Sequence, residues 1–383
     1  MELKQRKIAV ILSTGSLKND DRVRKEVVTL IEEGCNTVDI FAKVKNNESV
    51  KGITDYGAHF ELLHLKTRDF LPSAKGLILK IFEMYFKLRK KLREYDIIWC
   101  ADEGMFIFPL MLSRKRYVIW DLHEIPSMFD SNKFTRRFFK YVANKCTLVI
   151  HANKYRLEYL IQQNMIRDIN KHIYINNFPD VSFVNTCIVP DSLNDIQNWL
   201  NGKSYAYLQG VNDSGRYPYN SIAAILKSTD YKIIITADKF EKAIEDELID
   251  EFNDEYKSRV FFTGMLDQLY TPSIIKNAKF SLVFYKSNNP NNRYCEANRF
   301  YQPIAFGVPL ICGNNEPMRD IIKEHNNGIF IESDGSDLNQ IIEAIKILCM
   351  NYEYYRKNTE AICKKFIWHN SDVFNMLNRK IIG

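Results

Sequence analysis

NRYCEANRFYQPIAFGVPLIC, residues 292–312, combines a polar loop, a helix and a buried strand. Good helix formers run from 297 to 306, and Gly307-Val308-Pro309 ends the helix before an apolar run. A helix entered from a polar loop presents backbone N–H groups and its positive dipole end, which stabilise a phosphate without a metal. Asn298 and Gln302 are four residues apart and share one face. The pattern predicts a phosphate-facing helix, or an ordinary helix of an α/β repeat.

Short apolar runs alternate with helical patterns on both sides of this stretch, which predicts an α/β fold with parallel sheets. The runs form two successive series, so we expect two Rossmann-like domains facing one central cleft. The predicted domains are residues 1–180, residues 181–364, and a C-terminal helix at 365–383 that packs back on the first domain. No GxGxxG follows the first strand, which argues against a nicotinamide cofactor. The predicted strands are residues 7–14, 37–41, 96–100, 117–120, 147–150, 205–210, 232–236, 260–263, 280–285, 310–312 and 329–331, and the stretch 174–179 ends the first half.

Length and composition indicate a globular protein of more than one domain. The chain has 383 residues, of which 46% are hydrophobic and 26% charged. Its eight cysteines form no CxxC pair, and neither a signal peptide nor an apolar run of about 20 residues is visible. We therefore expect a cytoplasmic protein with reduced cysteines. The net charge of +6, without a nucleic-acid motif, favours anionic small molecules or membrane lipid as partners and argues against nucleic acid.

Two basic amphipathic segments are candidates for contact with a membrane. The predicted helix 74–93 and the segment 133–141 both mix aromatic residues with Lys and Arg. Such segments can lie on an anionic membrane surface, where each cation adds roughly 1 kcal/mol. The alternative is that their apolar sides pack on the sheet and the cations are only solvated. The first interpretation predicts a protein held peripherally on the inner face of the cell membrane.

A polar cluster follows one of the predicted buried strands. Asp121-Leu122-His123-Glu124 comes directly after residues 117–120. In an open parallel sheet, the residues beyond the carboxyl ends of the strands line the ligand crevice. His123 between two carboxylates is therefore a candidate for chemistry, although a lone histidine is more often structural.

Several short motifs occur in the same order as in a known enzyme family. Together they resemble the GT-B glycosyltransferases of the large retaining family 4 over nearly the whole chain. The matching segments are residues 20–26 (DDRVRKE, similar to DPRVRKE), 121–124 (DLHE, similar to DxHE), 176–179 (NNFP, similar to NxP), 208–216 (LQG…GR, similar to QG…GR), and 298–302 with 305–309 (NRFYQ and AFGVP, similar to PNKxFE and AxGxP).

The resemblance implies a nucleotide-sugar donor held mainly by the second domain and an acceptor held mainly by the first. Arg216 would neutralise the diphosphate, the Asn298 helix start would add N–H groups, and His123 would lie by the transferred sugar. The implied catalytic residues are His123, Glu124 and Arg216. The implied donor-binding residues are Gly210, Arg216, Gly264, Met265, Glu296, Asn298, Arg299 and Gln302, with Gly264 and Met265 against the base. The implied acceptor-binding residues are Gly15, Ser16, Asp21 and Arg22.

The chain departs from the family pattern at the ribose-binding position. The family usually has two glutamates eight residues apart, whereas here Tyr294 and Gln302 occupy those positions and Glu296 is two residues off. The amide oxygen of Gln302 can still accept from a hydroxyl, although a charge-assisted hydrogen bond is roughly twice as strong.

The resulting expectation is a metal-independent, retaining glycosyltransferase of surface polysaccharide biosynthesis, acting on a glycan or lipid-linked oligosaccharide. No Asp-x-Asp occurs, which argues against a metal-dependent GT-A enzyme. We expect no metal and no cofactor other than the nucleotide-sugar co-substrate. The alternatives are a nucleotide-sugar epimerase, or a catalytically silent GT-B subunit that binds a partner, and Gln302 is the feature that favours the latter.

Overall fold

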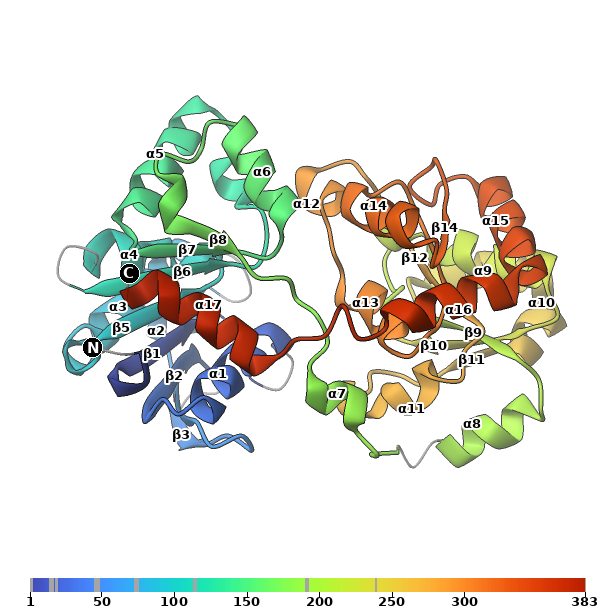
Figure 1. The fold of residues 1–383 in the computed structure, drawn as a ribbon, viewed down its shortest axis with the longest axis horizontal. Coiled ribbons are helices and arrows are strands. Elements are labelled where there is room, and N and C mark those ends of the chain that lie inside the picture. The colour runs from blue at the N-terminus through green and yellow to red at the C-terminus, as the bar shows by residue number, and fades with distance from the viewer. Residues whose placement is uncertain are drawn as a thin grey trace. The chain divides into compact units, whose positions relative to one another are not determined.

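The computed structural model describes residues 3–13, 17, 20–44, 49–71, 76–112, 116–189, 193–237 and 240–382. The chain divides into two compact units, Met1–Asn176 with His369–Gly383, and Asn177–Trp368. Each unit carries its own sheet flanked by helices (Figure 1). The two α/β domains predicted from the sequence are present, and the chain returns to the first unit at His369.

The first sheet has the strand order β3-β4-β2-β1-β5-β6-β7-β8. Its pairs are parallel except for β3 and β4. Five of the six residues of β1 are buried, because helices cover both faces of a doubly wound sheet. The strands are β1 (Lys7–Leu12), β2 (Thr37–Lys43), β3 (Val50–Ile53), β4 (His59–Leu63), β5 (Ile97–Ala101), β6 (Tyr117–Leu122), β7 (Leu148–His151) and β8 (His172–Tyr174).

The antiparallel pair β3 and β4 was not anticipated. Val50 and Ile53 are 41% and 62% exposed, so this edge strand lacks the apolar run that marks the central strands. Gly52 pairs with Phe60, and a Cβ there would lie 2.7 Å from the Phe60 ring. The hairpin thus depends on a cross-strand contact that residue patterning does not reveal.

The last helix of the chain packs against the first. Thr29 Oγ1 donates to Asn370 Oδ1 at 2.8 Å, and Asn370 Nδ2 donates to Glu32 Oε2 at 2.6 Å. In Figure 1 the red C-terminal helix α17 lies on the first unit beside α1. The helices of this unit are α1 (Asp21–Glu32), α2 (Lys66–Phe70), α3 (Leu77–Leu88), α4 (Ile107–Leu112), α5 (Lys133–Lys145), α6 (Lys154–Gln162) and α17 (Asn370–Ile382), with short 3-10 turns that include η2 (Lys91–Glu94) and η3 (Glu103–Phe106).

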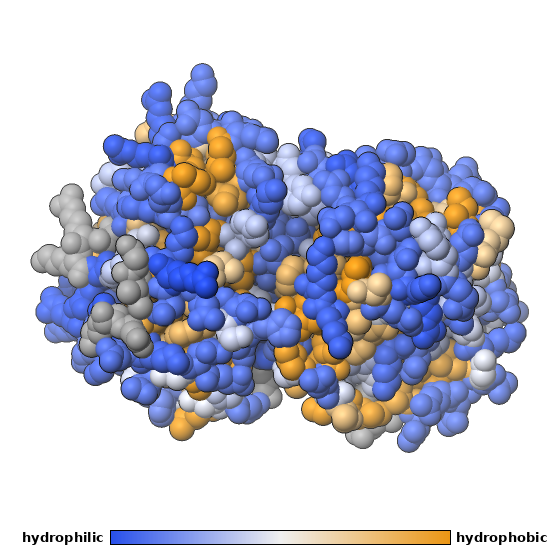
Figure 2. All heavy atoms as spheres, in the orientation of Figure 1, coloured by the Kyte–Doolittle hydropathy of each residue, from blue (hydrophilic) through white to orange (hydrophobic). Residues whose placement is uncertain are grey.

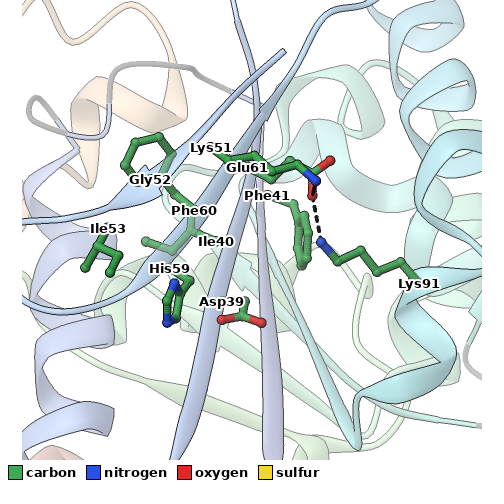
Figure 3. A pocket seen from close by; sticks show the side chains of 10 residues that line it. All are labelled: Asp39, Ile40, Phe41, Lys51, Gly52, Ile53, His59, Phe60, Glu61 and Lys91. Carbon is green, nitrogen blue, oxygen red and sulfur yellow. Dashed lines mark hydrogen bonds and ion pairs between the residues drawn. The ribbon is translucent and has the colours of Figure 1, made fainter.

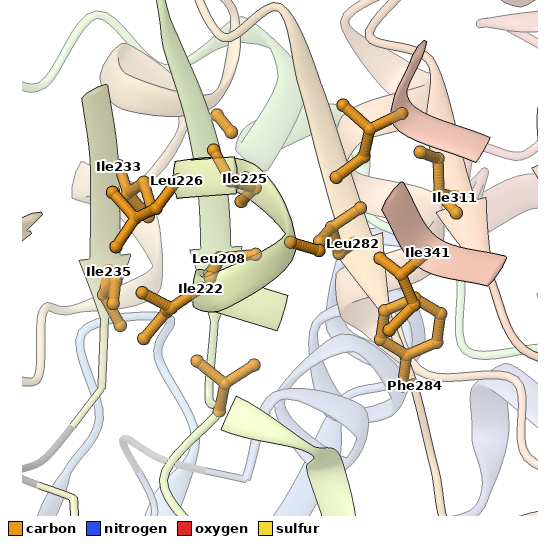
Figure 4. Packing of buried hydrophobic residues seen from close by; sticks show 14 of the residues in the cluster. Leu208, Ile222, Ile225, Leu226, Ile233, Ile235, Leu282, Phe284, Ile311 and Ile341 are labelled. Carbon is orange, nitrogen blue, oxygen red and sulfur yellow. The ribbon is translucent and has the colours of Figure 1, made fainter. Parts of the chain in front are cut away.

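The second sheet is parallel throughout its described strands, in the order β11-β10-β9-β12-β13-β14. Figure 4 shows isoleucine and leucine side chains from its strands packed against helices α9 and α15. Lys232–Thr236 has an uninterrupted buried Ile-Ile-Ile run, as a strand covered on both faces requires. The strands are β9 (Tyr205–Gln209), β10 (Lys232–Thr236), β11 (Val260–Phe262), β12 (Phe280–Val283), β13 (Leu310–Cys312) and β14 (Gly328–Phe330).

The helix predicted from residues 297–306 is present as α13, which begins at Asn298 and ends at Ala305. Gly307 follows it with a positive φ of 71°, the left-handed conformation that ends helices. In the part of the chain that the structure describes, no helix combines the length and apolarity needed to span a bilayer. The helices of this unit are α7 (Val181–Asn185), α8 (Leu193–Leu200), α9 (Pro218–Ser228), α10 (Lys242–Arg259), α11 (Pro272–Ile275), α12 (Pro290–Arg293), α13 (Asn298–Ala305), α14 (Glu316–His325), α15 (Leu338–Met350) and α16 (Tyr352–Ile362), and the 3-10 turn η6 spans Ser214–Arg216.

Candidate functional site

Two arginines of the second unit converge on Gly210. Arg299 Nη1 donates to the carbonyls of Gln209 at 2.8 Å and Gly210 at 3.3 Å, and Arg299 Nη2 donates to Phe284 O at 3.0 Å. Arg216 Nη1 also donates to Gly210 O. These carbonyls lie at the ends of β9 and β12, which are neighbours in the sheet. From β9 the chain continues to β10 on one side, and from β12 it continues to β13 on the other side. Ligands of doubly wound sheets bind at this topological switch point.

The charge of Arg299 is not balanced by a carboxylate among the described residues. Its side chain is 6% exposed, and its guanidinium lies 4.3 Å from the Tyr285 ring centroid. Burial is the main cause that lowers the Arg299 pKa, and nearby Arg216 lowers it further. Arg216 is 35% exposed, and its Nε lies 3.1 Å from Oδ2 of half-exposed Asp213. Two neighbouring cations with so little neutralisation make the switch point favourable for an anion.

Gly210 has a left-handed backbone conformation and lies close to both arginines. Its φ is +62°, and a Cβ would lie 2.9 Å from Arg216 Nη1 and 3.9 Å from Arg299 Nη1. Glycine is favoured here by the left-handed backbone conformation, and any Cβ would also displace the end of the Arg216 side chain. Gly210 was predicted to bind the donor, and the structure places it beside both arginines.

Helix α13 carries the other residues predicted to bind a donor. Gln302 is 1% exposed, and its Oε1 has no hydrogen-bond partner among the described residues. Glu296 precedes the helix and accepts a hydrogen bond from Tyr301 at 2.8 Å. The N-cap, Ala297, offers no side-chain acceptor to the first turn at Asn298. An unpartnered buried oxygen costs about 1–3 kcal/mol, so Gln302 would gain from a donor such as a hydroxyl.

Gly264 and Met265 follow β11. Gly264 has a φ of +71° and nothing within 4 Å of a Cβ position, and its carbonyl accepts from Thr263 Oγ1 at 2.9 Å. The Met265 side chain is 66% exposed. The placement of a base against Gly264 and Met265 stays a prediction from the sequence.

A buried ion cluster occupies the first unit. Arg22 from α1 donates to both carboxylate oxygens of Asp121, at 3.1 and 2.9 Å, and to Ile175 O at 2.9 Å. Arg22 Nε also lies 3.2 Å from Glu26 Oε1, one helical turn away. Asp121 Oδ2 is 2.9 Å from His123 Nε2, and the His123 side chain is 21% exposed. The cluster thus links α1 to the end of β6 and leaves only His123 in contact with solvent.

The pKa values of the cluster follow from its burial and charges. Burial opposes ionisation of Asp121, but Arg22 and His123 hold the pKa of that carboxyl well below its usual range. For His123, burial is outweighed by Asp121, which raises the pKa of the imidazole. Burial and the charge of Asp121 raise the pKa of Glu26 well above normal. The ionised Asp121 thereby stabilises a protonated His123.

Glu26, Asp121 and His123 could in principle hold a metal ion, since their ligand atoms lie within 4.8 Å of one another. However, the guanidinium of Arg22 contacts both carboxylates at 2.9–3.2 Å. A cation is therefore already present between them, and a divalent ion would have to displace a buried arginine. We assign no metal to this cluster.

The residues predicted to border an acceptor differ in their placement. Gly15 and Ser16 lie outside the described residues. Asp21 forms ion pairs within α1, with Arg24 at 2.7 Å and Lys25 at 2.9 Å. Arg22, which was expected to border an acceptor pocket, is 4% exposed and is directed into the cluster. Glu124 is exposed at the end of β6.

Sequence reasoning missed two groups in the first unit. Ser13 Oγ donates to Asp102 Oδ2 at 3.0 Å across the β1/β5 switch point, and burial with nearby Asp102 and Glu124 raises the pKa of Glu103 to about 7. His151 Nε2 and His172 Nδ1 lie 2.9 Å apart and buried, and burial lowers the pKa of His172 to about 4. Asp102 and Glu103 follow the predicted strand 96–100, so this acidic pair was visible in the sequence. No sequence pattern indicates that His151 and His172 contact each other.

A separate pocket of about 470 Å³ opens on the β3–β4–β2 edge of the first sheet (Figure 3). Its charges are mutually satisfied: Lys91 contacts Glu61 at 2.6 Å, and the Tyr95 hydroxyl donates to Asp39. It also lies away from the carboxyl ends of the strands, because Asp39 and His59 pair near the strand starts. We assign it no ligand.

Comparisons with known proteins identify the fold. No family model and no curated protein matches the sequence. Sucrose-phosphate synthase from Thermosynechococcus elongatus has 14% identity and a TM-score of 0.75, with 99% of each chain covered. HepE from Anabaena, solved with UDP and glucose, has 14% identity and a TM-score of 0.73, covering 98% of this chain and 99% of HepE. A glycosyltransferase from Rickettsia africae has 10% identity and a TM-score of 0.69, covering 99% and 97%.

These likenesses, at such low identity, show the fold and leave the activity to be argued from the site. The fold class predicted from the sequence, GT-B, is confirmed. The chain thus has the GT-B fold, with two arginines that converge on Gly210 at the switch point of its second unit.

Proposed function

We propose that this chain is a glycosyltransferase that takes a sugar from a nucleoside-diphosphate sugar. The observation that carries the proposal is the convergence of Arg216 and Arg299 on Gly210 at the β9/β12 switch point. HepE, which has the same fold, was solved with UDP and glucose, which supports a UDP-sugar as the donor. The glycosyltransferase from Rickettsia africae has a similar fold, which also supports the proposal.

The chemistry of sugar transfer needs what this switch point supplies. When the bond between sugar and diphosphate breaks, the leaving phosphate gains negative charge, and cations already fixed in place stabilise that charge. Arg216, as the more exposed guanidinium, would contact the diphosphate, assisted by the start of α13. The unpartnered Oε1 of Gln302 would accept from a ribose hydroxyl. Gly264 and Met265 would lie against the base.

The first unit would supply the acceptor side. We propose a glycan or lipid-linked oligosaccharide acceptor of surface polysaccharide biosynthesis, with His123 and Glu124 taking part in transfer. Asp121 favours the protonated form of His123, and an imidazolium can donate to an oxygen that gains charge. The proposed reaction is retaining. It requires no metal, because arginines supply the positive charge that a metal would otherwise provide.

Nucleotide binding tests this proposal. We expect UDP or another nucleoside diphosphate to raise the melting temperature of the wild-type protein, and Arg216→Ala to weaken its binding by roughly tenfold to a hundredfold. Arg356→Ala is the control, because this arginine is exposed on α16 and paired with Glu360 in the same unit. If no nucleotide in a panel binds the wild type, or if both variants bind equally well, the proposal is wrong.

Changing Gln302→Glu in the same assay separates the alternatives. The carboxylate would be buried without a partner, so we expect lower stability in the free protein and tighter nucleotide binding by about tenfold. The epimerase alternative is tested by product analysis instead of binding, because an epimerase would convert the donor sugar without any acceptor. A silent partner-binding subunit would bind no nucleotide in either form.

The surface of α3 favours contact of the first unit with an anionic membrane. Only one side of the helix packs on the protein: Ile81, Met84 and Leu88 are buried, whereas Phe86 is 54% and Leu79 55% exposed. Apolar side chains also gather over α5 and α6 on the face shown in Figure 2. The exposed residues of α3 and the turn after it are Ile78, Leu79, Phe86, Lys87, Arg89 and Lys90. We propose that the exposed side of α3 lies on anionic lipid.

Flotation with phosphatidylglycerol vesicles measures that contact. Reversing Arg89→Glu together with Lys90→Glu should weaken binding roughly 30-fold, since each cation contributes about 1 kcal/mol. The matched control reverses two exposed lysines of the second unit, Lys357→Glu with Lys364→Glu. Equal binding by both double variants, or equal binding to neutral phosphatidylcholine vesicles, would rule out this surface.

A further inference from the structure

The loop that carries Arg216 ends in a strained residue. Tyr217 has φ 51° and ψ 53°, the left-handed conformation, and it precedes Pro218 at the start of α9. That conformation costs a non-glycine residue roughly 1–2 kcal/mol, and a following proline favours extended backbone instead. Tyr217 therefore needs contacts that hold it. If it relaxed, the adjacent Arg216 would move with it.

Asp334 supplies such a contact. The Tyr217 hydroxyl donates to Asp334 Oδ1 at 3.0 Å, and the Ser287 amide donates to Asp334 Oδ2 at 2.8 Å. The next amide, that of Lys286, donates to Gly215 O at 2.8 Å. One carboxylate thus joins the Arg216 loop to the segment after β12. Burial opposes its ionisation, but the hydrogen bonds from Ser287, Ser336 and Tyr217 lower the pKa of Asp334, so it is ionised at neutral pH.

The turn around Asp334 is packed directly onto the tyrosine. Gly335 has a φ of +115°, and a Cβ there would lie 2.7 Å from both the Tyr217 ring and the Phe284 side chain. Asn220, in the first turn of α9, donates to the carbonyls of Gly335 at 2.8 Å and Ser336 at 3.1 Å. The start of α9 is therefore attached to residues 334–336 through the Tyr217 hydroxyl, the Tyr217 ring and the Asn220 amide.

We propose that Asp334 is a positioning residue for the reaction: by holding Tyr217 in its left-handed conformation, it fixes Arg216 where a nucleoside diphosphate binds. The inference rests on the proposed function, because it assigns Arg216 to the diphosphate. Asp334 acts through Tyr217, and both its oxygens accept hydrogen bonds from protein donors.

The first experiment needs no nucleotide. Hydrogen exchange in peptides covering residues 211–221 should be roughly tenfold faster in Tyr217→Phe and in Asp334→Ala, because each loses a hydrogen bond to a charged group. The matched control is Tyr219→Phe, two residues further along, whose hydroxyl donates to Glu251. This control should leave exchange at residues 211–217 unchanged. Unchanged exchange in both test variants overturns the proposal.

The second experiment compares UDP with UMP. In Tyr217→Phe and Asp334→Ala, UDP should bind about tenfold more weakly while UMP changes less than about twofold, since the loop contributes to the diphosphate. General destabilisation would weaken both nucleotides alike and would overturn the positioning role. If exchange accelerates as expected but the wild type binds no nucleotide, Asp334 still fixes the Arg216 loop and only the proposed function fails. Tyr219→Phe should bind both nucleotides as the wild type does.

Discussion

Replacing Arg22 by methionine is expected to lower the free energy of unfolding of the first unit by about 3–5 kcal/mol at neutral pH. The guanidinium is almost fully buried and contacts both Asp121 and Glu26. Methionine fills much of the same space but leaves the Asp121 carboxylate, which is 0% exposed, with His123 as its remaining counter-charge among the described residues. It also removes the donor to the Ile175 carbonyl. A buried charge that loses its main partner is among the most destabilising of single changes.

Hydrogen exchange of the central strands β5 and β6 measures this loss, because their amides exchange only on extensive unfolding. The control is Arg24→Met on the same helix, where the arginine is 22% exposed and paired with Asp21. We expect this control to cost less than about 1 kcal/mol. Equal losses in the two variants would show that the cluster does not depend on Arg22.

Acid should reduce the difference between the Arg22→Met variant and the wild type. The pKa of Asp121 is lowered in the folded protein, so its stabilising contribution is present above the unfolded pKa of about 3.9 and is lost as the pH falls below it. In the variant this carboxyl is held less strongly in its ionised form. Urea unfolding at a series of pH values between neutrality and acid should therefore show the two free energies converging at the acid end.

Replacing Arg299 by methionine is expected to cost the second unit about 2–4 kcal/mol, because three carbonyls lose a charged donor. Arg299 is the donor to Gln209 O and Phe284 O, which end the two strands of the switch point. The loss of its own desolvation cost offsets part of the effect. Nucleotide affinity should fall more than tenfold, since one of the two cations is gone and the Gly210 turn is less restrained.

Calorimetry with UDP and hydrogen exchange at β9 and β12 together check this prediction. Arg356→Met is the control, since that side chain is 47% exposed and its pairing with Glu360 should be worth about 0.5 kcal/mol or less. Full nucleotide affinity in a destabilised Arg299→Met variant would mean that Arg299 supports the fold and does not serve the ligand.

Much of the fold could be predicted because it depends on local patterns. The buried strand at Lys232–Thr236 and the helix at Asn298–Ala305 follow from apolar runs, helix formers and a terminating glycine. The β3–β4 hairpin could not be predicted in this way, since its edge strand is exposed and its Gly52–Phe60 contact joins two strands. Periodicity reports which face of an element is buried but not which element covers it.

The sequence indicated which residues would lie near the candidate site, but it indicated much less well what each of them contacts. Arg216, Gly210 and Gln302 were expected near a donor, and the structure places the first two together at the switch point. Arg22 was expected at a ligand, yet it pairs with Asp121, 99 residues away. Asp334 was not expected at all, because its partner Tyr217 lies 117 residues away. Such pairs depend on strand order, which the sequence does not state directly.

Composition, hydrophobic periodicity and turn residues were thus enough to establish an α/β protein of two Rossmann-like domains, and the order of its motifs was enough to suggest a sugar-nucleotide site. The tertiary structure alone decided which arginine is buried in an ion cluster, which converges on Gly210 and which carboxylate holds the Arg216 loop. The reason is physical: a buried polar group must find a partner within about 3 Å, and that partner is supplied by whichever strand end or helix the topology brings beside it.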